Sequence, residues 1–115
     1  MLEDRLIEYG CDVKGALLRF LGRKDLYLSL VEKFLEDTSY QGAVSAFEEK
    51  NAESYFYAVH TLKGVSGNLG FTKLYEMASE ICSDYRGMRK EDAYSKFGKL
   101  TECYNEICAV ISGGL

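Results

Sequence analysis

Proline and tryptophan are absent from this chain of 115 residues, and histidine occurs only once. The lack of proline suits long uninterrupted helices, because proline breaks helix interiors and often marks strand edges and turns. Cations are also in the minority: 14 Lys and Arg stand against 18 Asp and Glu, a net charge of −4. Without a basic stripe, nucleic acid is not expected as a partner.

No apolar run reaches the roughly 18 residues that a membrane span needs, and the initial Met-Leu-Glu-Asp does not resemble a signal peptide. We therefore expect a cytoplasmic protein without membrane contact. The four cysteines show no Cys-x-x-Cys spacing, and one solvent-facing histidine cannot complete a usual zinc site with them. We expect them to be reduced and buried, and we expect neither a metal nor a cofactor.

Apolar residues recur at helical spacing and predict an all-α fold, an antiparallel four-helix bundle forming a single domain over residues 1–115. The bundle helices are expected at about 25–39, 52–69, 72–86 and 91–111, with short N-terminal helices at 2–9 and after Asp12, another short helix near 41–50, and a frayed end at 112–115. The N-cap candidates are Asp12, Asp25 and Thr72. In the last bundle helix, a heptad seam consists of Ala93, Phe97, Leu100, Tyr104, Ile107 and Ile111.

The segment 60–70, His-Thr-Leu-Lys-Gly-Val-Ser-Gly-Asn-Leu-Gly, holds the single histidine and three glycines. At 3.6 residues per turn, the apolar residues of this helix share one face with Leu62. His60, Gly64 and Gly67 then lie together on the opposite face. The histidine is therefore expected to face solvent, with a glycine in each of the next two turns.

A glycine inside a helix costs about 1 kcal/mol relative to alanine, and an exposed face seldom needs glycine for packing. Gly64 and Gly67 therefore favour access, because bare backbone lets a bulky partner approach the imidazole. Lys63 brings a positive charge to the same patch. An exposed imidazole with a nearby cation suits the transport of a phosphoryl group, which arrives as an anion.

These residues carry a resemblance to a known family. The run His60-Thr61-Leu62-Lys63-Gly64, followed by Gly67, Leu69 and Gly70 and continuing through Leu74, Ala78 and Ile81, resembles the signature of histidine-containing phosphotransfer (HPt) domains. The resemblance implies a helical bundle whose histidine accepts a phosphoryl group from a receiver-domain aspartate and passes it to another receiver. By this resemblance His60 is the phosphoacceptor, Lys63 helps to neutralise the phosphate, and Gly64 keeps the approach clear.

The implied partners are response-regulator receiver domains and a hybrid histidine kinase, with the domain itself a monomer. The resemblance leaves open both a free-standing protein and a domain of a larger kinase. A histidine-kinase dimerisation helix usually has an acid directly after the histidine and a proline a few residues on. Here Thr61 follows the histidine and proline is absent.

A short turn at Gly70 predicts that the helices 52–69 and 72–86 form an antiparallel hairpin. Cys82 then lies level with His60, and Arg86 lies one turn further. HPt domains often have Gln or Glu where Cys82 stands, to hold the histidine ring by a hydrogen bond, so this chain departs from the family there. Arg86 matches a basic position in some members, and is interpreted either as a second cation for the phosphate or as a solvated surface residue.

Phe56 and Tyr57 lie one turn before His60 and toward its side of the helix. Aromatic residues are enriched at the centres of protein interfaces, so this pair predicts a docking patch for the partner. The alternative is partial burial against the first helices.

The chain contains no glycine-rich phosphate loop after a strand and no acidic cluster for Mg²⁺. It is therefore interpreted as a phosphoryl carrier and not an enzyme, without autokinase activity. The alternative is a non-catalytic helical interaction module, which gives no reason for glycine at positions 64 and 67. A metal or haem bundle would need His60 to point into the core.

Overall fold

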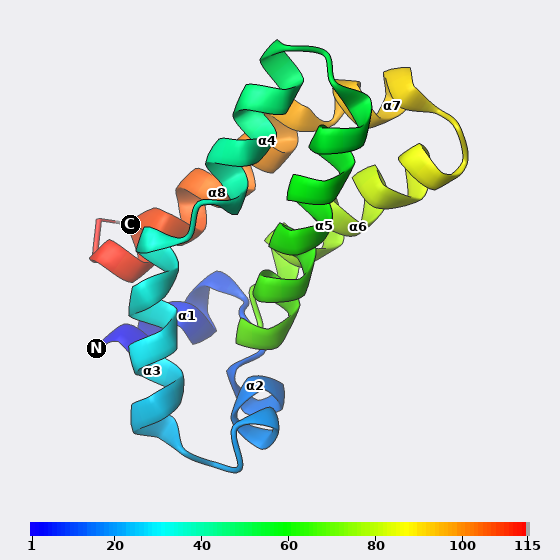
Figure 1. The fold of residues 1–115 in the computed structure, drawn as a ribbon. Coiled ribbons are helices and arrows are strands. Elements are labelled where there is room, and N and C mark those ends of the chain that lie inside the picture. Colours follow the sequence, from blue (N-terminus) through cyan, green and yellow to red (C-terminus); the bar gives the residue numbers. More distant parts are fainter. Residues whose placement is uncertain (115) are drawn as a thin grey trace.

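Helices form the whole architecture of residues 1–114, which are the residues that this computed structural model describes (Figure 1). No strand occurs among them. In chain order the α-helices are α1 (Leu2–Tyr9), α2 (Val13–Arg19), α3 (Lys24–Lys33), α4 (Ser39–Glu48), α5 (Ala52–Leu69), α6 (Thr72–Arg86), α7 (Lys90–Ser95) and α8 (Phe97–Ser112). A single 3₁₀ turn, η1 (Phe34–Glu36), follows α3. The predicted all-α class is confirmed.

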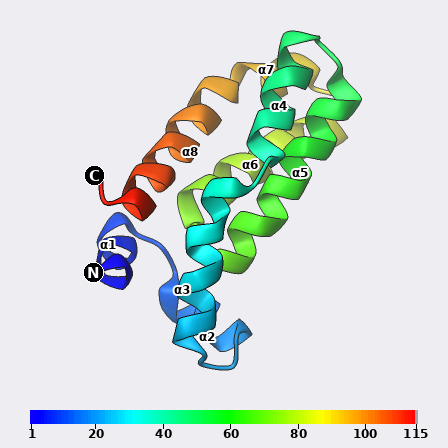
Figure 2. The ribbon, with the colours of Figure 1, turned by 60° about the vertical axis from the view of Figure 1, so that its left-hand side comes forward.

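Four helices, α4, α5, α6 and α8, run side by side in alternating directions (Figures 1 and 2). α5 packs along its length on α4 and α6, and α8 packs on α6. Stacked aromatic rings join α4 to α8: the ring centroids of Tyr40 and Tyr104 are 4.0 Å apart, and those of Phe47 and Phe97 are 4.3 Å apart. The antiparallel four-helix bundle is therefore confirmed.

Two expected helices are interrupted. The helix expected at 25–39 ends at Lys33, and the chain passes through η1 before α4 begins at Ser39. The bundle helix on this side is therefore α4, which was expected only as a short helix near 41–50. The helix expected at 91–111 is divided between α7 and α8 at Lys96.

A side chain bonds to a nearby backbone group at each of these two places. Asp37 has an extended backbone, and its carboxylate accepts a hydrogen bond of 2.8 Å from the amide of Ser39, which starts α4. The hydroxyl of Ser95 donates to the carbonyl of Asp92 at 2.7 Å, the carbonyl that the amide of Lys96 would use in a continuous helix. The apolar stripe of α3 continues into η1 and that of α7 continues into α8, so periodicity alone does not reveal where α3 and α7 end.

One hydrophobic core joins the bundle to the N-terminal helices. The expected core face of α5 is confirmed: Tyr55, Val59 and Leu62 are at most 1% exposed. In the predicted seam of α7 and α8, every member is buried except Phe97, which is half-buried. His60 lies on the other side of α5 from this core.

The N-terminal segment closes the carboxyl end of α5. The backbone amide of Asp12 donates to the carbonyl of Gly70 at 2.8 Å, and the hydroxyl of Tyr27 donates to that of Leu69 at 2.8 Å. The Arg19 guanidinium donates to the carbonyl of Gly67 at 2.7 Å. The amides of Gly70 and Thr72 also donate to the carbonyls of Gly67 and Gly70, so the bonds from the N-terminal segment add to the local turn at this helix end.

Helix ends confirm some of the predicted caps and correct others. The Asp12 carboxylate accepts from the amide of Gly15 at 3.0 Å and caps α2 as expected. Asp25 and Thr72 were wrong as caps, because both lie inside their helices, which begin after Arg23 and Phe71. α8 extends to Ser112, one residue into the end expected to fray, and ends on Gly113 with φ 82°. Leu115, the last residue of the end that was expected to fray, lies outside the described residues.

Within residues 1–114, no helix is both long and apolar enough to cross a membrane.

Candidate functional site

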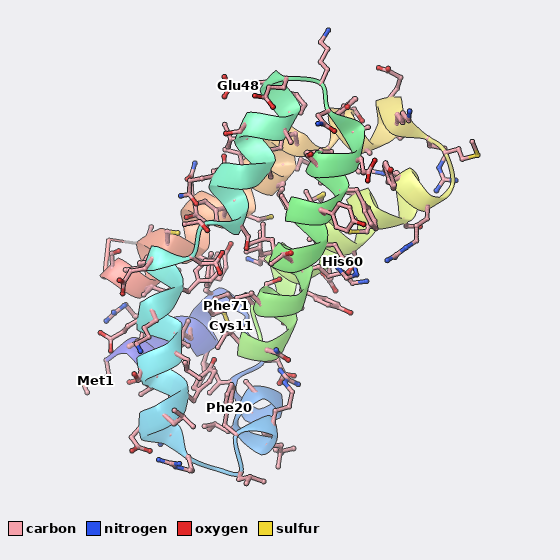
Figure 3. All side chains as sticks on the ribbon, in the orientation of Figure 1. Met1, Cys11, Phe20, Glu48, His60 and Phe71 are labelled. Carbon is pink, nitrogen blue, oxygen red and sulfur yellow. The ribbon has the colours of Figure 1, made fainter. Side chains whose placement is uncertain are left out.

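His60 projects from the middle of α5 toward the outside of the bundle (Figure 3). Its side chain is exposed, whereas its neighbours Val59 and Leu62 are fully buried. The helix therefore presents the imidazole to solvent because its opposite face is held by the core. The expected orientation of His60 is confirmed.

Gly64 lies one turn after His60 on the same exposed face. A Cβ added at Gly64 would meet nothing within 4 Å, so no neighbouring group explains the absence of a side chain. Lys63, next to it, is half-buried, and its Nζ lies 6.0 Å from the centroid of the Tyr75 ring. The backbone beside the imidazole is therefore open, with a cation at its edge.

Gly67 has a different environment, because a side chain of α6 lies against it. A Cβ at Gly67 would stand 2.9 Å from the Cδ1 atom of Tyr75, which projects from α6. This distance is shorter than a normal van der Waals contact, so glycine leaves room for the Tyr75 ring beside α5. Gly67 therefore has a packing reason within the chain, and an access role is not needed to explain it.

A groove of about 610 Å³ extends from His60 toward α2. Its lining includes Lys63, Gly64 and Gly67 on α5, Tyr75 and Glu76 on α6, and Asp12 and Arg19 from the N-terminal segment. Sequence reasoning missed Tyr75 and Arg19, since neither belongs to the histidine segment. The hairpin offers a signal for Tyr75, because residues at similar distances before and after the turn face each other. Nothing in the sequence pattern indicates Arg19.

Cys82 lies beneath the site and is fully buried. Burial raises the pKa of its thiol, although the positive charges of Lys63 and Arg86 lower it in part. No hydrogen bond joins Cys82 to His60 within residues 1–114. The expected departure from the family is therefore visible in the structure: at this position, no side chain of α6 holds the ring by a hydrogen bond.

Phe56 is half-buried, and its ring stacks on Tyr85 of α6 with centroids 4.5 Å apart. Its other neighbours are the His60 ring, with the centroids 5.6 Å apart, and the Arg86 guanidinium, whose carbon lies 5.1 Å from the ring centroid. Phe56 is therefore partly buried, as the alternative to a docking patch predicted. The burial is against α6 and not against the first helices. Tyr57 is 63% exposed and remains accessible.

Lys63 and Arg86, the two cations predicted for the site, are not paired with carboxylates. The four ion pairs within residues 1–114 join Lys24 to Glu3, Arg89 to Asp84 and Asp92, and Lys96 to Asp84. Lys63 and Arg86 take part in none of them, and both contact aromatic rings. The positive charge of both side chains is therefore available to an incoming anion.

A family model for the Hpt domain matches residues 29–110, a range that contains every site residue predicted from the sequence. Hpt domains are phosphocarriers of two-component systems. No curated protein and no solved structure matches the chain. The match spans most of the chain and leaves out α1, α2, the first part of α3 and the last two residues of α8. The chain therefore belongs to the Hpt domain family and has a role in two-component phosphotransfer.

Proposed function

We propose that His60 accepts a phosphoryl group from the aspartate of a receiver domain and passes it to a second receiver. The observation that carries this proposal is an exposed imidazole, the only one in the chain, beside the open backbone of Gly64. A receiver presents its phosphoryl group on a folded surface, so the acceptor must stand clear of its own neighbours. His60 meets that requirement.

The transfer needs little from this chain beyond a positioned nucleophile. An imidazole nitrogen of His60 attacks the phosphorus, the N–P bond forms, and the P–O bond of the acyl phosphate breaks. The bonding electrons leave on the aspartate carboxylate. Transfer to the next receiver is the same exchange in reverse, with a carboxylate oxygen attacking and the imidazole leaving.

The neighbours of His60 have distinct roles in this proposal. Lys63 and Arg86 supply positive charge to the phosphoryl oxygens, because neither is paired with a carboxylate in the ion pairs of residues 1–114. Gly64 provides the space for the partner, and the exposed Tyr57 is a docking contact. Gly67 contributes indirectly, by letting Tyr75 form the wall of the groove.

We also propose that the domain carries the phosphoryl group without phosphorylating itself. The receiver would supply the acidic pocket and the metal ion that the reaction uses, as the family resemblance implies. The shared hydrophobic core supports a single domain. A docking partner that approaches His60 from solvent requires no second copy of the chain, which supports action as a monomer.

The experiment uses a panel of isolated receiver domains that are phosphorylated with labelled acetyl phosphate and then mixed with the chain. We expect the label to move to the wild-type chain from at least one receiver, and not to His60→Gln. Circular dichroism should show the same helix content in both, because His60 is exposed. Labelled ATP alone should not label the chain.

Two outcomes would contradict the proposal. Label on His60→Gln would show that another residue is the acceptor, and label from ATP alone would show autokinase activity. Stable binding of a receiver without transfer to the wild type would favour the alternative, a non-catalytic helical interaction module.

A further inference from the structure

We infer that Phe56 is a positioning residue that orients the imidazole of His60 and holds the guanidinium of Arg86 beside it. This inference rests on the proposed function, and it assigns to an aromatic ring the orienting task that Cys82 does not perform by a hydrogen bond. Phe56 contacts the phosphoacceptor and one of its cations, and its own place is set by α6.

Phe56 has a fixed position because both helices of the hairpin hold it. Its ring stacks on Tyr85 at 4.5 Å between centroids and 19° between planes. Stacking of this kind adds to the burial of the ring, which is half-buried here. Because the Phe56 ring belongs to α5 and is held in place by α6, it can orient side chains from both helices.

His60 follows Phe56 by four residues, so the two side chains are neighbours on the surface of α5. Their ring centroids are 5.6 Å apart with a 39° angle between the planes. The Phe56 ring occupies the space on one side of the imidazole and limits its rotation there. The opposite side faces the open backbone of Gly64, where the partner is expected. The ring therefore favours orientations of His60 that face the groove.

Arg86 approaches the same ring from α6, with its guanidinium carbon 5.1 Å from the centroid. A cation above an aromatic ring is held by the electron-rich face, yet it keeps its full charge. A charge-assisted hydrogen bond to a phosphoryl oxygen is stronger than this contact. Phe56 therefore keeps Arg86 beside His60 until a phosphoryl group attracts the guanidinium.

The open side of His60 shows a comparable arrangement. Lys63 Nζ lies 6.0 Å from the centroid of the Tyr75 ring. Each of the two cations near His60 thus contacts an aromatic ring and no carboxylate among the ion pairs of residues 1–114. Of the two rings, only Phe56 also contacts the imidazole, and it is therefore the one that can position both groups.

The first experiment uses NMR of the unphosphorylated chain and compares Phe56→Leu with Phe56→Tyr. Leucine keeps apolar volume but removes the ring, whereas tyrosine keeps the ring. We expect Phe56→Leu to change the coupling and NOE signals that report the side-chain rotamers of His60 and Arg86, which do not depend on the ring current of Phe56. We expect Phe56→Tyr to leave these signals near their wild-type values. Unchanged His60 and Arg86 signals in Phe56→Leu would overturn the inference.

Phe20→Leu is the matched control. Phe20 is also half-buried, and it lies at the end of α2, away from His60 (Figure 3). The Phe20→Leu substitution makes the same chemical change as Phe56→Leu, with a comparable loss of packing. His60 and Arg86 signals that move as much in Phe20→Leu as in Phe56→Leu would show a general loosening of the fold and overturn a specific role.

The second experiment measures single-turnover transfer from the labelled receivers to wild type, Phe56→Leu, Arg86→Gln and the double variant. We expect Phe56→Leu to slow transfer by about tenfold, since small displacements of a reacting group have effects of this size. If Phe56 acts partly through Arg86, the double variant is faster than the product of the two single losses predicts. Phe56→Tyr should restore transfer.

Fully multiplicative losses, or no rescue by tyrosine, would reduce Phe56 to ordinary packing and overturn the inference. Failure of the proposed function gives a different result, because the wild-type chain then takes no label from any receiver. The NMR comparison needs no transfer, and in that case it alone decides whether Phe56 orients His60 and Arg86.

Discussion

The two halves of α5 on either side of His60 differ in what surrounds the exposed face. Before His60, Phe56 is covered by Tyr85 and contacts Arg86, so the surface is filled by side chains. After His60, Gly64 leaves open backbone and a groove continues to α2. One helix thus combines a packed side, which can orient the imidazole, with an open side, which can admit a partner.

The open half contains three glycines that are spaced by three residues, and each has a different environment. Gly70 has φ 77° and lies against the backbone of Asp12, Gly67 lies against the Tyr75 ring, and a Cβ at Gly64 would meet nothing within 4 Å. The same residue type thus serves a chain turn, a packing contact and an open surface. Substitutions at the three positions test this distinction.

Gly70→Ala should have the largest effect. The residue is left-handed, and a Cβ there would stand 2.4 Å from the backbone oxygen of Asp12, so α2 would have to move. We expect the free energy of unfolding to fall by about 3 kcal/mol. Urea denaturation measures this change. A loss below about 1 kcal/mol would mean that the N-terminal segment is not held tightly against α5.

Gly64→Gln should have the next largest effect, on transfer and not on stability. The new side chain would stand between His60 and the receiver, and we expect transfer to slow by about tenfold. Gly64→Ala should be as stable as the wild type or more stable, by up to ~1 kcal/mol, because nothing blocks its Cβ. Normal transfer by Gly64→Gln would contradict the access role. A destabilised Gly64→Ala would indicate close packing instead.

Gly67→Ala should have the smallest effect, because two contributions oppose each other. Alanine favours the helix by about 1 kcal/mol, but its Cβ would displace the Tyr75 ring. We expect a net change in the free energy of unfolding within about 1 kcal/mol. In a Tyr75→Ala background the ring is absent, so the same substitution should show the full helix preference. An equal effect in both backgrounds would exclude the packing explanation.

Much of the fold could be predicted because its helix ends carry local signals. The ends of α1 and α5 follow from glycines at positions 10 and 70, both with left-handed backbones. Asn51 caps α5, because its side chain accepts a hydrogen bond from the amide of Ser54 at 3.1 Å. A break between α3 and α4 was expected, but several residues too late, because the apolar pattern of α3 continues into η1. The break between α7 and α8 could not be predicted, because the apolar pattern continues through it.

The candidate site, like the fold, has some features that could be predicted from the sequence and others that could not. The solvent-facing position of His60 and the open position of Gly64 follow from helical periodicity, which depends only on neighbours in the sequence. The contacts of Gly67 with Tyr75 and of Phe56 with Tyr85 depend on how α5 and α6 meet. Periodicity places a residue on a face, but it does not say what packs against that face. The functional roles of these residues stay predictions.

The bonds from the N-terminal segment to the end of α5 affect how that helix opens locally. Asp12, Arg19 and Tyr27 all lie before residue 29, where the match to the family begins, yet they bind the carbonyls of residues 67–70. Amide exchange in proteins follows local opening, and a helix end whose partners are removed opens more easily. A chain shortened to residues 29–110 should therefore exchange its amides faster around Gly70, at the wall of the groove beside His60. The boundary of family similarity is thus not the boundary of the cooperative unit.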